Sequence, residues 1–478
     1  MNHSNSPEQV ETLVLGGGIA GLASAALLGA RGHKVSLVEG QSWWGGKLRR
    51  LYFSNDDIID SGPSIFTLPI VWQNFVKAWE EASGLAAPEL DRHKYKGVGY
   101  YSFDDGELDL ASTTHDALKD WSRYLEKHEK SAEDLTAMTF LDPKSRHAFK
   151  PGLRLVKDHR FRRSMEEYLD KDLELERKTA DIIRIHALNT GSTPANLPAF
   201  FASLAASLYH GGVSAPKGGM YELVHSLLAM NEAVGNKLYK DHEILEISEN
   251  QVKTNKLNFK YEQLVNSIDI DRFHELRGRT EDKTKEKKWT ASALAIYGQL
   301  NEGWSCPERY LDEHLVLMPS DTPKFFKELH EKDYLSSTMS FVSVHPPGSH
   351  IYPGNTKATF SLIITTHPDG SDINQLSDLV DSEWERLERR GFKNFRSNIS
   401  EQFCFDPKYY AGFGALGGSL YGPALKAMRA GPFHPVPYKD KLWSKTWHVG
   451  TRVHPGGGIP AVLGGVLIGS SKIPEPKR

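Results

Sequence analysis

The chain has 478 residues, of which 39% are hydrophobic and 25% charged, and its formal net charge is −3. This length exceeds one ordinary hydrophobic core, so we expect two domains, and the small net charge excludes a general attraction to nucleic acid. The two cysteines, Cys306 and Cys404, match no metal-ligand or redox spacing, which predicts reduced thiols in a cytoplasmic protein and no metal site. Residues 1–11 lack the basic region and apolar run of a signal peptide, and the longest nearly apolar stretch, 197–209, is too short to span a bilayer.

A glycine-rich turn follows the first expected strand, Leu13–Leu15. Gly16, Gly18 and Gly21 have the spacing G-x-G-x-x-G. The first glycine lets the chain turn sharply, the second lets the backbone approach a pyrophosphate, and the third lets the following helix, 22–30, pack against the strand. The N-terminus of that helix presents free N–H groups and a positive dipole end to phosphate.

An acidic residue ends the next expected strand. Residues 34–38 have the composition of a strand, and Glu39 follows them. An acid at this place accepts hydrogen bonds from the ribose hydroxyls of an adenosine. Strand, glycines, helix, strand and acid in this order predict a Rossmann-like dinucleotide-binding unit, for which a glycine-rich turn in another kind of α/β protein is the alternative.

Two more glycine-rich turns are expected to approach the same ligand. The pair Gly45-Gly46 predicts a second close approach of the backbone, although an ordinary surface turn explains the pair equally well. Near the end of the chain, an expected strand at 445–450 precedes the glycines of 456–458, which let the backbone press against a flat ligand. Pro460 then suits the first position of a helix that starts from Ala461.

These segments resemble the FAD-dependent carotenoid desaturases of the bacterial phytoene-desaturase type, over nearly the whole chain. That family has a glycine pair followed by Arg, where this chain has Gly45-Gly46 and then Lys47. It also has an Asp-x-Gly-Pro turn, which matches 60–63, and a His-Pro-Gly-x-Gly-x-Pro segment against the flavin ring, which matches 454–460. Lysine retains the positive charge of arginine but not its planar fork, so we assign no bidentate phosphate contact to Lys47.

The resemblance implies FAD as the cofactor, together with a set of contact residues. Ile244, in an expected strand at 242–248, matches a residue whose backbone meets the adenine. Two candidate catalytic residues also follow, His454 as a proton acceptor and Arg184 as the basic residue of the substrate domain, and a structural role is the alternative for both. The implied cofactor contacts are Gly16, Gly18, Ile19, Ala20, Gly21, Glu39, Gly45, Gly46, Lys47, Asp60, Gly62, Pro63, Ile244, Gly450, Thr451, Gly457, Gly458, Ile459 and Pro460.

The resemblance also implies an α/β fold with a Rossmann-like FAD-binding domain of the glutathione-reductase/amine-oxidase type and an inserted α+β substrate domain. The FAD-binding domain is expected from residues 8–95, 214–292 and 436–478, and the substrate domain from 96–213 and 293–435. Strand-like stretches in the second half of the chain, interrupted by one expected helix, predict a mixed sheet as the floor of the substrate domain. These strands are expected at 292–300, 338–344, 359–366 and 402–405, and the helix at 372–390.

Three segments bear on contact with a membrane. The segment 198–209 is apolar nearly all round, which is typical of a buried helix, a helix in lipid or the wall of a tunnel. Basic residues gather at 154–163 and charged residues at 271–288, where solvated surface and contact with anionic lipid are the alternatives. Because a long polyene is insoluble in water, we expect peripheral association with the inner face of the membrane through 197–209 and 272–288.

The resemblance implies dehydrogenation of an acyclic carotenoid, with hydride transfer to flavin N5, a new conjugated double bond, and oxygen or a quinone as electron acceptor. Val453 before His454 is similar to the carotenoid 3,4-desaturases that act on 1-hydroxylated substrates, whereas Thr is common there in phytoene desaturases. Alternatives with the same fold and flavin are a phytoene desaturase, a carotenoid isomerase and a retinol saturase-like enzyme. A flavin amine oxidase and a non-catalytic lipid-binding relative of the prenyl-protein chaperones are further rivals.

Overall fold

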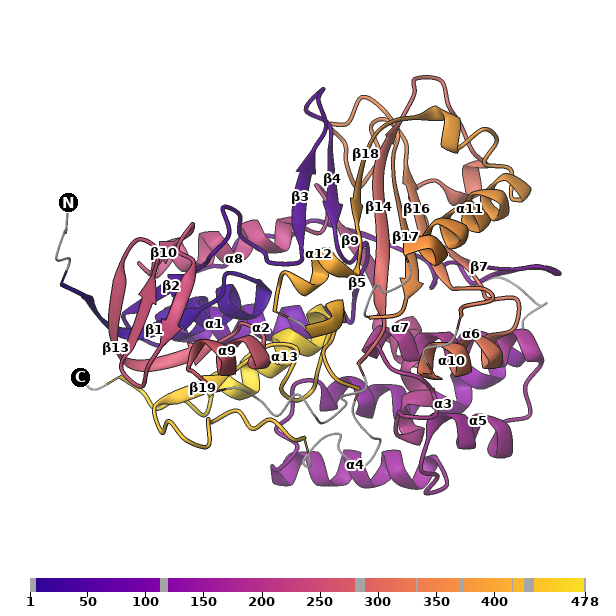
Figure 1. Cartoon of the computed structure of the whole chain (residues 1–478). Coiled ribbons are helices and arrows are strands. Elements are labelled where there is room, and N and C mark those ends of the chain that lie inside the picture. Colours follow the sequence, from indigo (N-terminus) through magenta and orange to yellow (C-terminus); the bar gives the residue numbers. More distant parts are fainter. Residues whose placement is uncertain are drawn as a thin grey trace.

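The computed structural model describes residues 6–111, 119–279, 289–331, 334–368, 373–414, 416–424 and 434–476. Two seven-stranded sheets dominate these residues, and a group of helices lies below the second sheet in the view of Figure 1. The first sheet and its helices form the left part of that view, and the second sheet rises at the upper right. The functional site lies where these three parts meet.

The first sheet has the strand order β10-β2-β1-β13-β12-β11, with β19 also paired to β13. β10, β2, β1, β13 and β19 are parallel neighbours, and β12 and β11 add an antiparallel pair beside β13. This topology confirms the predicted Rossmann-like unit. The strands are β1 (Glu8–Leu15), β2 (Val35–Val38), β10 (Lys237–Tyr239), β11 (Ile244–Ile247), β12 (Gln251–Thr254), β13 (Asn258–Asn266) and β19 (Thr446–His448).

Both faces of the first sheet are covered. Leu13, Val14 and Leu15 are fully buried, which is typical of a parallel strand between two layers. Val14 packs in the core formed with α1, α2, α8 and α13, whereas Leu13 and Leu15 pack on the opposite side with α9. These helices are α1 (Ile19–Ala30), α2 (Pro69–Ser83), α8 (Glu222–Ala233), α9 (Ile270–Leu276) and α13 (Ile459–Ser470).

The second sheet has the order β18-β14-β17-β16-β15-β7-β8 and is mixed, because β15 and β7 are parallel while the other neighbours are antiparallel. It confirms the expected mixed sheet, and β14 and β17 have the predicted bounds. The helix α11 (Ile373–Arg389) packs beside it. The strands are β7 (Tyr100–Phe103), β8 (Gly106–Asp109), β14 (Ser292–Leu300), β15 (Leu315–Leu317), β16 (Ser340–His345), β17 (Thr359–Thr366) and β18 (Ile399–Phe405).

Short strands and helices complete the fold. One small sheet pairs β3 (Arg49–Tyr52) with β4 (Ile58–Ser61), and another has the order β5-β9-β6. The strands of the latter are β5 (Phe66–Thr67), β6 (Arg92–Lys94) and β9 (Val213–Pro216). The helices outside the first layer are α3 (Lys119–Met138), α4 (Arg146–Asp158), α5 (Met165–Asp172), α6 (Arg177–Ile185), η2 (His186–Thr190), η3 (Ala199–Ser203), α7 (Leu204–Gly211), η4 (Glu308–Tyr310), α10 (Thr322–Glu331), η5 (Arg396–Asn398), α12 (Pro407–Ala411) and η6 (Leu416–Gly418).

The structure corrects two expectations about the membrane segments. The stretch 198–209 forms η3 and α7 and is largely buried, with Ala202 and Ala206 fully so. Residues 271–276 are not loop but belong to α9, because Phe273 is fully buried against the first sheet. The remainder of the charged stretch, 280–288, lies outside the described residues. No helix within the described ranges is both long and apolar enough to cross a membrane.

Candidate functional site

The turn between β1 and α1 needs glycine at Gly16 and Gly21. Gly16 has φ +96°, a left-handed conformation that glycine tolerates. A Cβ on Gly21 would lie 1.8 Å from the Gly16 carbonyl oxygen, so α1 could not pack on the strand with any larger residue. α1 begins at Ile19, three residues earlier than expected, which places Gly21 within its first turn. The structure thus supports the roles that the sequence assigned to Gly16 and Gly21, and the approach of Gly18 to a pyrophosphate stays a prediction.

Glu39 holds the backbone of this turn. One of its carboxylate oxygens accepts a hydrogen bond from Gly17 N at 2.6 Å and the other from Gln41 N at 2.7 Å. Burial raises the pKa of Glu39, while the hydrogen bonds from these backbone groups oppose the rise. Glu39 lines a large cavity together with Ile244, the residue expected beside the adenine.

The second glycine turn lies directly against the first. Gly45 N donates to Gly17 O at 2.8 Å, and a Cβ on Gly46 would lie 3.2 Å from Gly18 Cα. The two turns therefore form one continuous backbone wall at the N-terminus of α1. A wall without side chains at a helix N-terminus fits the diphosphate of a dinucleotide.

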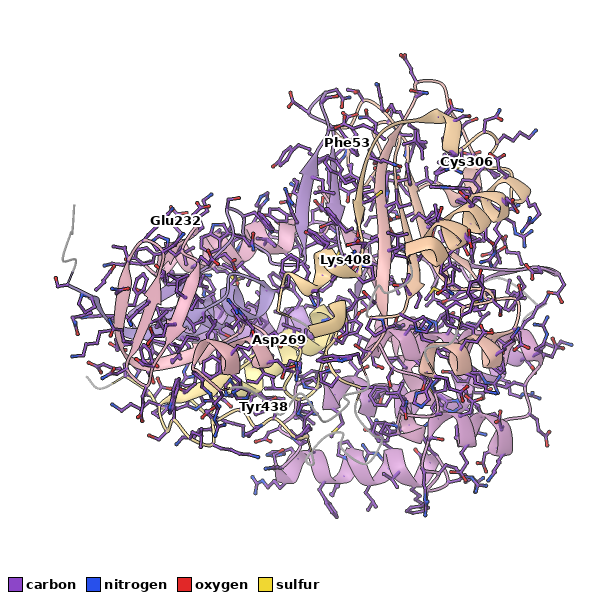
Figure 2. All side chains as sticks on the ribbon, viewed as in Figure 1. Phe53, Glu232, Asp269, Cys306, Lys408 and Tyr438 are labelled. Atoms are coloured by element: carbon purple, nitrogen blue, oxygen red, sulfur yellow. The ribbon has the colours of Figure 1, made fainter. Side chains whose placement is uncertain are left out.

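A buried charge cluster stands beside this wall. Lys47 Nζ donates to Leu420 O at 2.8 Å, and Arg452 pairs with Asp269 and Asp271 at 3.1 and 3.0 Å. Burial lowers the pKa of Lys47 to about 8, an effect that Asp269 opposes and Arg452 reinforces. Figure 2 shows Asp269 near the centre of the molecule. The positive charges of Arg452 and Lys47 are therefore matched by the two carboxylates of Asp269 and Asp271.

The C-terminal glycine segment forms the opposite wall. α13 begins at Ile459, so Pro460 is its second residue rather than its first. A Cβ on Gly457 would lie 1.9 Å from the ring of Tyr421, which also packs against Gly191. Burial lowers the pKa of His454 to about 4, and nearby His434 adds to the effect, so the imidazole is uncharged at neutral pH.

One cavity of about 1750 Å³ joins these loops to the second sheet and the helices. All predicted cofactor contacts except Gly21 and Asp60 line it, as does His454. Their contacts with FAD stay predictions, but the structure brings them together around one space. Sequence reasoning missed the residues that continue the wall away from these loops, and no local motif marks them: Tyr101, Phe149, Leu153, His186, Asn189, His314, Phe341 and Tyr421.

Asp60 and Arg184 lie away from the cavity and belong to ion pairs. Asp60 accepts from Arg50 Nε at 2.9 Å and from Tyr221 N at 2.8 Å. Arg184 pairs with three carboxylates, those of Glu166, Asp170 and Asp181, and its side chain is 11% exposed. The geometry therefore favours a structural role for both residues and gives no support to Arg184 as a catalytic group.

The parallel sheet, the glycine wall, the acid after β2 and the apolar cavity define a dinucleotide-dependent oxidoreductase of the flavin type. The chain belongs to the family described as flavin containing amine oxidoreductase, whose match covers residues 19–401. This finding confirms the predicted flavin cofactor, FAD, and the predicted amine-oxidase type of fold. The residues present fit that cofactor, because the turns at 16–18 and 45–46 present backbone without side chains at the N-terminus of α1, where a diphosphate would bind.

The relatives match this chain over nearly its whole length. A 4,4'-diapolycopen-4-al dehydrogenase of Metabacillus indicus is 24% identical over 490 residues, which cover 96% of each chain. A 1-hydroxycarotenoid 3,4-desaturase of a Flavobacterium species is 24% identical over 515 residues, covering 97% of this chain and 99% of the relative. Among solved structures, an oxidoreductase from Methanosarcina mazei superposes with a TM-score of 0.62 at 14% identity, covering 97% of this chain and 100% of the other.

Proposed function

We propose that the protein is an FAD-dependent desaturase of an acyclic carotenoid. The observation that supports this best is the cavity of about 1750 Å³, which includes the space between the flavin loops and continues beyond them along an apolar wall. A long hydrocarbon needs such a space. The names of the relatives, which include a carotenoid desaturase, agree with it.

The residues of the chain act by positioning the substrate and by excluding water. When bound, FAD supplies the acceptor for the hydride that leaves an allylic carbon. The apolar residues of the cavity would hold the polyene and exclude water, and Gly457, packed against the Tyr421 ring, would let the backbone lie close to a bound flavin. The neighbouring carbon loses a proton as the new double bond forms, and no strong base is required for this loss because the conjugated chain delocalises the developing positive charge. The pKa of His454, near 4, agrees with a weak acceptor or a structural residue.

The finer proposal is terminal 3,4-desaturation of a 1-hydroxycarotenoid, with oxygen or a quinone as the electron acceptor. Val453 before His454 supports it, as does the name of the Flavobacterium relative. A phytoene desaturase is the alternative, since any allylic position presented to the flavin can react. The two functions differ in the substrate that is converted faster.

We expect a 1-hydroxylated acyclic carotenoid to be converted at least about tenfold faster than phytoene when both compete in one reaction supplied with oxygen or a quinone as acceptor. The physical reason is that a site built for a hydroxyl discriminates strongly against the analogue that lacks it. Absorbance and mass of the products measure the two rates, and enzyme stripped of FAD is the control. Faster conversion of phytoene, with several double bonds introduced, would reassign the protein to the phytoene desaturases and leave the FAD site unchanged.

We also propose that α4 mediates peripheral membrane association, in place of the segments expected from the sequence. Its side chains Phe149, Leu153 and Val156 are 70%, 52% and 39% exposed, although all three are large and apolar. All three line the cavity, so the apolar face of α4 lies at its mouth. Exposed Lys150 and Lys157 on the same helix suit anionic headgroups, and Figure 1 shows α4 at the lower edge of the molecule.

The double variant Phe149→Ser/Leu153→Ser is expected to float with anionic liposomes about 10- to 100-fold less than the unchanged protein, because burying such a side chain in lipid contributes roughly 1.5–3 kcal/mol. Flotation in a density gradient measures the bound fraction. Leu442→Ser is the matched control, since Leu442 is 53% exposed on another part of the chain. Equal flotation of the double variant and the unchanged protein would exclude α4 as the docking element.

A further inference from the structure

The cavity contains a small polar region within its otherwise apolar wall. Tyr101 Oη lies 3.0 Å from His186 Nε2, and Asn189 Nδ2 lies 3.1 Å from His186 Nδ1. All three side chains line the cavity. An amide nitrogen can only donate, so Nδ1 accepts and Nε2 donates to the Tyr101 oxygen. The O–H of Tyr101 is then left with no acceptor among the described residues.

His314 lies on the same face of the second sheet. Tyr101 pairs with Val316 across β7 and β15, and side chains alternate along a strand, so His314 and Tyr101 project to the same side. Phe341 and Ile363 on the neighbouring strands line the cavity as well. The face that Tyr101 and His314 share is therefore a wall of the substrate space.

One ring nitrogen of His314 has no hydrogen-bond partner among the described residues. The residue is 4% exposed, and no described residue hydrogen-bonds to its Nε2, which is buried. Burial lowers the pKa of His314 to about 3 and that of His186 to about 4, so both rings are uncharged at neutral pH. An unmatched buried polar atom is costly, and a ligand that pairs with it removes that cost.

We propose that Tyr101 and His314 form a subsite for a terminal hydroxyl of the substrate. This inference rests on the proposed function and names the residues that give it its specificity. A hydroxyl both accepts and donates, so it can accept from the Tyr101 O–H and pair with His314 Nε2. A carboxylate is excluded by the absence of a cation in this group, and a plain hydrocarbon end leaves both protein groups unsatisfied.

The position of the subsite agrees with this role. η2 runs from His186 to Thr190, and the next residue, Gly191, packs against the Tyr421 ring beside Gly457. Five residues of 3₁₀ helix span roughly 10 Å. The polar group therefore lies about the length of η2 from the flavin loops. Because the hydroxyl on C1 is only a few bonds from C3 and C4, 3,4-desaturation requires the subsite to lie at the flavin end of the cavity.

The test compares two substrates in the FAD-loaded enzyme, a 1-hydroxylated acyclic carotenoid and the same polyene without the hydroxyl. Tyr101→Phe and His314→Phe are each expected to lower the ratio of kcat/KM for the hydroxylated over the plain substrate about tenfold. His314→Gln retains a donor and an acceptor and is expected to restore most of the ratio. Phe341→Leu is the matched control, which should alter both substrates alike and leave the ratio unchanged.

Two outcomes separate the subsite from the function. A ratio within twofold of the unchanged enzyme in both phenylalanine variants, with FAD retained, would overturn the subsite while the desaturase function stands. Conversion of neither carotenoid by the unchanged holoenzyme would overturn the function. In that case, equilibrium binding of the two carotenoids, followed by their absorbance shift, still tests whether Tyr101→Phe selectively weakens the hydroxylated one.

Discussion

Gly21→Ala is expected to abolish FAD binding and to destabilise the protein by more than about 4 kcal/mol. The added Cβ would lie 1.8 Å from Gly16 O and 2.7 Å from Ser267 Oγ, and the first of these is backbone that cannot move aside. α1 would have to leave the sheet, and with it the helix N-terminus that faces the diphosphate. Flavin absorbance after gel filtration in excess FAD, together with thermal unfolding, measures both effects.

Gly152→Ala is the matched control for this change. Gly152 also lies within a helix, but a Cβ there would meet nothing within 4 Å. Alanine is the better helix former, so the control is expected to keep its FAD and to gain up to about 1 kcal/mol. Stoichiometric FAD in Gly21→Ala would show that the close packing of α1 on the first strand is not required.

Asp60→Ala is expected to destabilise the protein by about 3 kcal/mol, because it leaves Arg50 buried without its main partner. The side chains of Arg50 and Asp60 are 9% and 1% exposed, and Arg50 also contacts Glu222 and Gly218 O. These contacts join the β3–β4 pair to the start of α8. Urea unfolding of the FAD-loaded protein measures the loss.

The control is Glu81→Ala, which removes an exposed ion pair with Lys77 and is expected to cost less than about 1 kcal/mol. FAD affinity separates the two roles considered for Asp60. Since Asp60 does not line the cavity, the folded variant should bind FAD nearly as tightly as the unchanged protein. A large loss of affinity without a loss of stability would restore Asp60 as a cofactor contact.

The membrane expectation shows how composition alone misplaces a surface. The stretch 197–209 is nearly apolar throughout, yet Leu197 and Leu208 are buried. α4 has more charge, and its exposed apolar residues Phe149 and Leu153 stand out only once the buried face of the helix is known. The apolar content of a segment indicates how strongly the segment favours burial, whereas its exposure depends on which elements cover it.

The sequence by itself determined the βαβ unit that is expected to bind the cofactor. Gly16, Gly21 and Glu39 act within one βαβ unit, where the backbone constraints are local and spacing alone specifies them. The tertiary structure alone decided the partners of Lys47, Asp60 and the wall that bears Tyr101 and His314. Lys47 donates a hydrogen bond to a carbonyl 373 residues away, and Arg50 of β3 also pairs with Glu222 of α8. Hydrogen bonds and ion pairs between distant segments require the complete packing, and no periodicity of the chain encodes them.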